Sequence, residues 1–241
     1  MKKHQINMKL SIILMTFMVV LNRATGAQHG DSGHNHKMRK RSAISNETLL
    51  WPGGVVPYLL DNSIDNRLDE AQHKIIQEIF AEIHNKTCIK FKPRQNETDY
   101  IHIMKGWVTK QAGWGNFGGR QDFLLSSRKI QKSEYFRAFV LQLGFLPEIA
   151  RLDLNKYLEF KKGNAIFLVD APTLPPKYAF LGTDDLDVPY DYCSVLHDPI
   201  DDKYGYTITP LKPYNCSKSI GYATSLSQID VLKINKLYKC P

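Results

Sequence analysis

The alternation of hydrophobic and polar positions predicts a domain of mixed α and β structure that begins after residue 41. The run 55–60 follows two glycines, as is typical of a strand after a turn. The stretches 87–91 and 100–104 predict two further strands, and the second alternates like a strand with one buried face. These three strands fall in the first half of the domain.

Three stretches carry apolar residues at helical spacing. The longest predicted helix spans 68–83, and a second spans 133–145. A last helix begins near Ser227, where Ser227-x-x-Asp230 resembles a capping box. Eight of the twelve prolines lie between residues 147 and 213, so we expect that region to be rich in loops.

The first 26 residues have the pattern of a secretory signal peptide. Three early lysines precede the apolar run 10–21, and Ala24-Thr25-Gly26 fits a cleavage site. The apolar run is too short for a comfortable membrane span. An uncleaved amino-terminal anchor is the alternative. We predict removal of 1–26, secretion to the extracellular space, and no membrane attachment afterwards.

Residues 27–41 are interpreted as a short pro-segment. The segment is polar, and it ends in the tribasic run Arg39-Lys40-Arg41, where exposed backbone is open to cleavage. An ordinary solvated run of charge is the alternative to processing at Arg41. The segment also contains four residues of types that can bind a metal loosely. We interpret the tract that holds them as a flexible polar spacer instead. The four residues are His29, Asp31, His34 and His36.

A division at residue 41 changes the meaning of the net charge. The whole chain has 32 basic and 24 acidic residues, a formal net charge of +8. Residues 1–41 hold eight of the basic residues and one of the acidic ones, which leaves 24 basic and 23 acidic residues in 42–241. The remaining net charge of +1 predicts no attraction to nucleic acid or to a membrane surface.

The cysteines and the glycosylation motifs both favour the secretory route. All four cysteines lie in 42–241, and an even number after a signal peptide predicts two disulfides, for which three pairings exist. The cysteines are Cys88, Cys193, Cys216 and Cys240. Four Asn-x-Ser/Thr motifs predict glycosylation in the same region. They are at Asn46, Asn85, Asn96 and Asn215.

Four short sequence motifs together resemble the astacin family of zinc metalloendopeptidases, which belongs to the metzincin clan. They occur in the family's order over nearly all of 42–241: LWPGGVVPY at 50–58, NKTCIKF at 85–91, DYI at 99–101 and LSQIDVLKINKLY at 226–238. The resemblance implies an α+β fold. Its amino-terminal subdomain has a twisted, mostly parallel sheet with two long helices, and its carboxy-terminal subdomain is loop-rich with one terminal helix. The resemblance also implies that the peptidase-like domain is 42–241.

The zinc motif of the family, HExxHxxGxxHExxRxD, is degenerate in this sequence. Its glycine is Gly144, which places the three histidine positions at Arg137, Leu141 and Pro147 and the general base at Ala138. In the family the histidines bind zinc and the glutamate polarises a zinc-bound water. None of these four residues has a side chain suited to those roles.

A second family element, Ser-x-Met-His-Tyr, lies under the metal, and its tyrosine can also bind zinc. It corresponds here to 194–198, with Asp198 in place of the tyrosine. Ser194, His197 and Asp198 lie too close in sequence to reach the geometry of a catalytic triad. The resemblance therefore leaves neither a metal site nor a catalytic residue.

The resemblance also implies a maturation contact and a disulfide pairing. In the family, the glutamate after the third histidine receives the new amino terminus. Here that glutamate is Glu148, and Ser42 would supply the ammonium. Cys88 and Cys240 match one family disulfide. The second family pair is missing at both ends, and Cys193 and Cys216 are extra, so we expect the pairs Cys88–Cys240 and Cys193–Cys216.

Three functions remain open at this point. The first is a secreted, inactive homologue, or pseudo-peptidase, that needs no cofactor and binds a protein or peptide partner. The second is an active zinc metalloendopeptidase with a rearranged site, but the four histidines of the domain are not at ligand spacing. The third is a product without function, against which the core pattern and the even cysteine count argue. We predict the first.

Overall fold

The computed structural model of the protein describes residues 42–128, 130–162, 165–167, 184, 186–200 and 207–241. The predicted signal peptide 1–26 and pro-segment 27–41, with the processing site at Arg41, lie outside the described residues. No helix among the described residues is long and apolar enough to cross a membrane.

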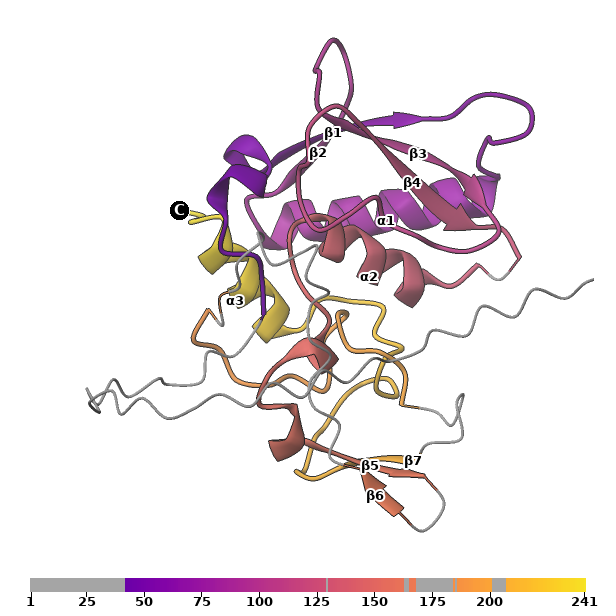
Figure 1. Cartoon of the computed structure of the whole chain (residues 1–241). Helices are drawn as coiled ribbons and strands as arrows, with labels where there is room; N and C mark the ends of the chain where they lie inside the picture. The colour runs from indigo at the N-terminus through magenta and orange to yellow at the C-terminus, as the bar shows by residue number, and fades with distance from the viewer. Residues whose placement is uncertain (1–41, 129, 163–164, 168–183, 185, 201–206) are drawn as a thin grey trace, which may run out of the picture. The chain divides into compact units, whose positions relative to one another are not determined.

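Four strands of the amino-terminal half form one parallel sheet (Figure 1). They are β1 (Val55–Leu60), β2 (Lys90–Pro93), β3 (Tyr100–Gly106) and β4 (Arg120–Ser126), in the order β2-β1-β3-β4. The strand 55–60 is confirmed. The predicted strand 87–91 begins later, because the backbone N–H and hydroxyl of Thr87 still donate to Ile83 at the end of the preceding helix.

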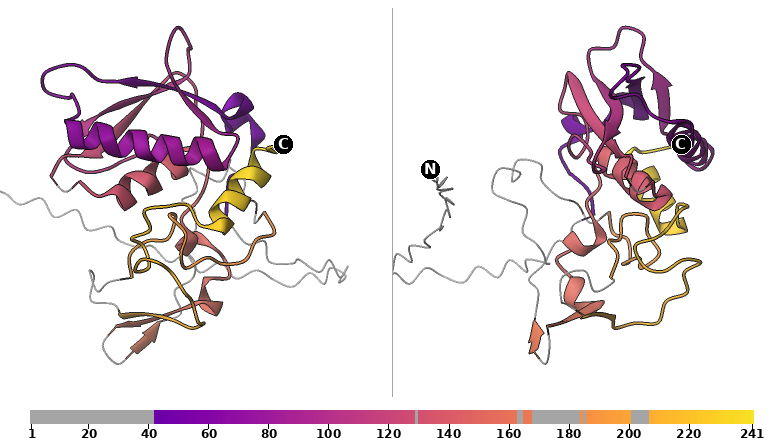
Figure 2. Two further views of the ribbon diagram at one scale, coloured as in Figure 1. Left: turned by 180° about the vertical axis from the view of Figure 1, so that it is seen from behind. Right: turned by 90° about the vertical axis from the view of Figure 1, so that its right-hand side faces the viewer.

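Two helices pack side by side on one face of this sheet (Figure 2). They are α1 (Glu70–Lys86), which opens with a capping box between Asp69 and Gln72, and α2 (Lys132–Gln142). The second helix ends earlier than predicted, because Gly144 has a left-handed backbone with φ of +99°. A Cβ atom there would lie 2.9 Å from the side chain of Ile44, so the turn is built around a glycine.

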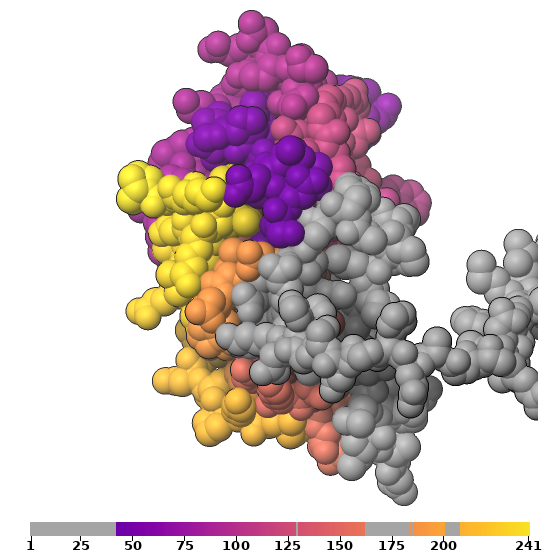
Figure 3. Space-filling view, turned by 60° about the vertical axis from the view of Figure 1, so that its left-hand side comes forward, coloured from indigo at the N-terminus to yellow at the C-terminus, as the bar shows by residue number. Residues whose placement is uncertain are grey.

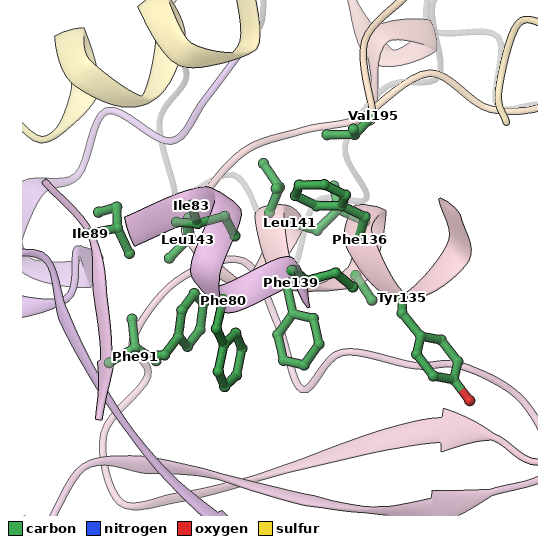
Figure 4. Packing of buried hydrophobic residues seen from close by; sticks show 14 of the residues in the cluster. Phe80, Ile83, Ile89, Phe91, Tyr135, Phe136, Phe139, Leu141, Leu143 and Val195 are labelled. Atoms are coloured by element: carbon green, nitrogen blue, oxygen red, sulfur yellow. The ribbon is translucent and has the colours of Figure 1, made fainter. Parts of the chain in front are cut away.

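An aromatic cluster fills the space between the helices and the sheet (Figure 4). The rings of Phe80 and Phe91 stack with centroids 4.1 Å apart, and those of Phe123 and Phe139 stack at 4.6 Å. Each pair joins a helix to a strand. The inner side of α2 is therefore held in place by close apolar packing against the sheet.

Among its described residues, the carboxy-terminal half is mostly loops, as expected, with one α-helix and a small sheet. The helix is α3 (Gln228–Leu237), and its capping box between Ser227 and Asp230 is present. An antiparallel sheet, which sequence patterns did not predict, has the order β6-β5-β7. Its strands are β5 (Leu158–Lys162), β6 (Ala165–Phe167) and β7 (Thr207–Pro210). The α+β fold expected from the resemblance is therefore confirmed.

Both pairs of cysteines form disulfides, with the expected pairing. Cys88, just after α1, is bonded to Cys240, just after α3, with their Cα atoms 5.4 Å apart. Cys193 is bonded to Cys216 within the loop-rich half, with Cα atoms 5.2 Å apart. The first disulfide fixes the chain's last helix to the first.

Candidate active-site region

Arg137 links α2 to two loop segments that are distant in sequence. Its Nε donates to the carbonyl of Val195 at 3.3 Å, and its Nη2 donates to the carbonyls of His197 at 2.5 Å and Gly221 at 2.8 Å. Its Nη1 lies 3.3 Å from a carboxylate oxygen of Asp198. The side chain is only 14% exposed, so these groups replace water as its partners.

The Arg137–Asp198 pair is an ion pair between a mostly buried arginine and an aspartate whose side chain is 36% exposed. Burial lowers the pKa of Arg137 and raises the pKa of Asp198, and the attraction between the two charges opposes both shifts. Arginine keeps its proton under all ordinary conditions in proteins. The position that the resemblance assigns to the first zinc-binding histidine therefore carries a fixed positive charge, and Asp198, at the position it assigns to the tyrosine, neutralises that charge.

The residues at the other positions of the family's zinc motif offer no metal ligand near Arg137. Leu141 lies one helical turn after Arg137 on the same side of α2, and both Leu141 and Ala138 are buried. Pro147 is half-buried and caps a short 3-10 helix at 148–150. A leucine, an alanine and a proline offer no side-chain nitrogen, oxygen or sulfur atom to a metal.

His197 is fully buried and uses both ring nitrogens within the fold. Its Nδ1 donates to the carbonyl of Asp198 at 2.7 Å, so its Nε2 accepts from the hydroxyl of Tyr190 at 2.8 Å. Burial, helped by the nearby charge of Arg137 and opposed by the hydrogen bond to the Asp198 carbonyl, lowers the pKa of His197 to about 4. The imidazole is therefore neutral and engaged, which leaves no nitrogen for a metal or for a base.

The side chain of Ser194 contacts α3. Its hydroxyl donates to Asp230 at 2.5 Å, and the backbone N–H of Val195 donates to the same carboxylate at 3.0 Å. Burial, together with the nearby Asp191, raises the pKa of Asp230 to about 6. Ser194, His197 and Asp198 thus do not form a triad, as their close spacing in sequence led us to expect.

The side chains in this region do not fit a zinc ion. Within the described parts of the chain, no three His, Cys, Asp or Glu residues come together in a way that could hold a metal. Two further histidines have structural partners elsewhere: His84 accepts from the backbone of Phe91, and His102 faces Asp61 at 3.2 Å. The positions that the resemblance assigns to the zinc ligands and the general base hold an arginine and three apolar residues.

Ser42 and Glu148 lie in one buried cluster, but Glu148 has a partner that sequence reasoning missed. The Glu148 carboxylate is paired with the ammonium of Lys233 on α3, and it lies 3.9 Å from Arg151. Arg151 in turn donates to the hydroxyl of Ser42 at 3.2 Å. The sequence did contain a sign of this pair, because Lys233 falls at helical spacing among the buried positions of α3, where a lysine needs a negative partner.

The four predicted glycosylation sites differ in exposure. Asn85, Asn96 and Asn215 are exposed, which is compatible with modification. Asn46 is half-buried, and its side-chain oxygen accepts hydrogen bonds from the backbone and hydroxyl of Thr48. Glycosylation at all four sites stays a prediction.

Comparison with known proteins gives matches across the same region. The family model for the astacin peptidases matches residues 43–239. The zinc metalloproteinase nas-8 of Steinernema carpocapsae is 31% identical over 213 residues, which cover 84% of this chain and 47% of the relative. The astacin-like metalloendopeptidase of Gallus gallus is 32% identical over 233 residues, which cover 89% and 52%. The chain thus spans about half the length of these curated relatives.

A solved structure is similar as well. High choriolytic enzyme 1, a hatching enzyme zinc-protease from the medaka fish Oryzias latipes, superposes with a TM-score of 0.64 at 25% sequence identity. The superposition covers 83% of this chain and all of that chain.

Proposed function

Because this chain belongs to the astacin family of peptidases, we propose that it is a member that has lost peptidase chemistry and acts by binding a protein or peptide partner. The relatives named above are zinc metalloproteinases or metalloendopeptidases by name.

The Arg137 guanidinium is the observation that carries the proposal. It stands at the family's first ligand position with donors on three carbonyls and a carboxylate. A metal dication in the same place would meet a fixed positive charge, and at a few ångströms their repulsion is several kcal/mol even in a screened environment. Binding zinc would therefore require the four contacts of Arg137 to be broken first.

The general base is a second missing component. Peptide hydrolysis by a metal needs a group that takes a proton from the attacking water, within hydrogen-bond reach. Ala138 at that position has no such group, and His197 is buried with both nitrogens engaged. We derive no hydrolytic step for this chain.

An exposed apolar surface next to the sheet supports partner binding. Trp107 is 74% exposed, and Val108 and Phe117 are exposed in the same connection between β3 and β4. Beside them a hollow of about 450 Å³ is lined by residues that include Lys110 and Arg120. Exposed aromatic residues and arginine are enriched in protein interfaces. We further propose that the domain is secreted after removal of residues 1–26 and 27–41.

A peptidase assay tests the proposal. The domain 42–241 is incubated with denatured casein and with a mixed peptide library, with and without added zinc, beside the medaka hatching enzyme as the active control. We expect no cleavage above buffer. A matched variant restores the family residues (Arg137→His, Ala138→Glu, Leu141→His and Pro147→His), and any activity it gains shows that the assay detects this fold. Cleavage by the unaltered domain that a chelator abolishes would instead establish the active metalloendopeptidase.

A further inference from the structure

The ion pair between Glu148 and Lys233 is shut off from solvent. Each side chain is only 1% exposed. Glu148 opens the 3-10 helix that follows Pro147, whereas Lys233 comes from the buried side of α3. The pair therefore joins the segment after the former zinc motif to the last helix of the chain.

A lysine buried this deeply needs a negative partner to stay charged. Burial lowers the pKa of Lys233, because an ammonium loses its hydration there. The adjacent Glu148 carboxylate is the anion that offsets this loss. Removing either partner leaves the other as an uncompensated buried charge, which is strongly destabilising.

The charges around Glu148 are balanced without any contribution from the amino terminus. Arg151 is fully buried, and its guanidinium pairs with Asp153 at 3.0 Å as well as approaching Glu148. Glu148, Asp153, Arg151 and Lys233 thus make two negative and two positive charges. A further ammonium would add an unmatched positive charge to the cluster.

Ser42 reaches the same cluster while still joined to Arg41. Its backbone N–H donates to the carbonyl of Asp184 at 2.8 Å, and its carbonyl accepts from Leu146 at 3.0 Å. Figure 3 shows the segment that begins at Ser42 (indigo) lying against α3 (yellow). In the uncut chain the nitrogen of Ser42 is a neutral amide, so it brings no charge to Glu148.

We propose that Lys233 is the resident counter-ion of Glu148, so that the contact which the resemblance assigns to a newly cut amino terminus is already made in the uncut chain. Cleavage at Arg41 then releases the pro-segment, and the ion pair around Glu148 is the same before and after the cut. This inference is independent of the proposed loss of peptidase activity, since it concerns stability before and after processing.

Thermal unfolding of two forms of the protein tests the inference. The uncut form, 27–241, carries alanine at positions 39–41 to block processing, and the cut form is 42–241. Each form is measured unaltered and as Glu148→Gln, Lys233→Met and the double variant. Lys239→Met is the matched control, because Lys239 pairs with Glu47 in an exposed ion pair, where loss of one partner costs little.

We expect both single variants to lower Tm by about 10 °C in both forms, since a buried charge is left alone and this domain is near 200 residues. The double variant should lower Tm by less than the sum of the two singles, also in both forms. The inference is overturned if Glu148→Gln lowers Tm only in the cut form, or if Lys233→Met behaves like the control.

The unaltered protein gives a second test that does not depend on any variant folding. If Lys233 already satisfies Glu148, the cut and uncut forms should unfold within about 3 °C of each other, because no buried ion pair is gained. A rise of about 10 °C on cleavage would mean that the Ser42 ammonium supplies the main counter-charge, and the inference would then be wrong.

Discussion

Position 137 shows what the sequence reveals about a single residue and what it does not. The register from Gly144 assigns Arg137 to the first ligand position, and that register depends only on local spacing. Its partners lie 58 to 84 positions away along the chain, so no local pattern could indicate them. For the same reason the Glu148–Lys233 pair, which spans two distant elements, was not predicted.

The buried imidazole of His197 predicts sensitivity to acid. Its pKa falls from 6.5 in the unfolded chain to about 4 in the fold, so the unfolded state binds more protons between these values. The stability that depends on neutral His197 is therefore complete above pH 6.5 and is lost as the pH falls toward 4. The full shift corresponds to about 3 kcal/mol.

The measurement is urea unfolding of the unaltered domain and of His197→Gln at a series of pH values from 7 to 4. Other buried carboxyl groups, including Asp230, titrate in the same range in both proteins, so the difference between the two curves is the relevant quantity. We expect the unaltered domain to lose more stability than the variant on acidification. Parallel curves would show that His197 does not carry this effect.

At the scale of elements, local signals predicted the beginnings of helices better than their ends. The capping box of α3 is visible in the sequence, because it needs only Ser227 and Asp230 at fixed spacing. The end of α2 depends on the close contact of Gly144 with Ile44, a residue about a hundred positions earlier. The sheet of β5, β6 and β7 pairs Glu159 with Thr209 across a long proline-rich stretch, so local sequence could not indicate the pairing of these strands.

Gln72 joins three elements and should be more important than an ordinary cap residue. It completes the capping box of α1, and its amide also donates to Tyr135 of α2 at 2.9 Å and to the carbonyls of Leu125 and Ser126 on β4 at 3.3 Å. We expect Gln72→Ala to cost roughly 2–3 kcal/mol, because buried acceptors lose their donor. Asp69→Ala removes only the cap and should cost about 1 kcal/mol.

Urea unfolding of these variants gives the comparison, with Gln77→Ala as the control. Gln77 is exposed on the same helix, so its removal should change stability by only a few tenths of a kcal/mol. Equal losses for Gln72→Ala and Asp69→Ala would contradict the view that Gln72 connects the helices to the sheet.

At the scale of the whole molecule, the described part of the chain is held in place near both its first and its last residues. The Cys88–Cys240 disulfide closes a span of 152 residues and anchors the carboxy-terminal residues to the end of α1. Ser42 is buried and its backbone N–H donates to the carbonyl of Asp184, and the backbone N–H of Ile44 donates to the carbonyl of Gly144. Residues 42–44 are therefore integrated into the fold.

The tribasic run predicts that the secreted protein begins at Ser42. An enzyme that cuts after the last basic residue of Arg39-Lys40-Arg41 would leave Ser42 as the first residue. Amino-terminal sequencing of protein secreted from cultured cells should read Ser42-Ala43-Ile44. Secreted protein that still carries Arg41 or the pro-segment would contradict the predicted processing.

The zinc content of the purified domain tests the central claim most directly. Protein 42–241 is expressed in medium that contains zinc, purified without chelators, and analysed for metal by mass spectrometry beside the variant with the four family residues restored. Because Arg137, Ala138, Leu141 and Pro147 supply no ligand, the account predicts no stoichiometric zinc in the unaltered domain. One tightly bound zinc ion per chain of the unaltered domain would contradict it.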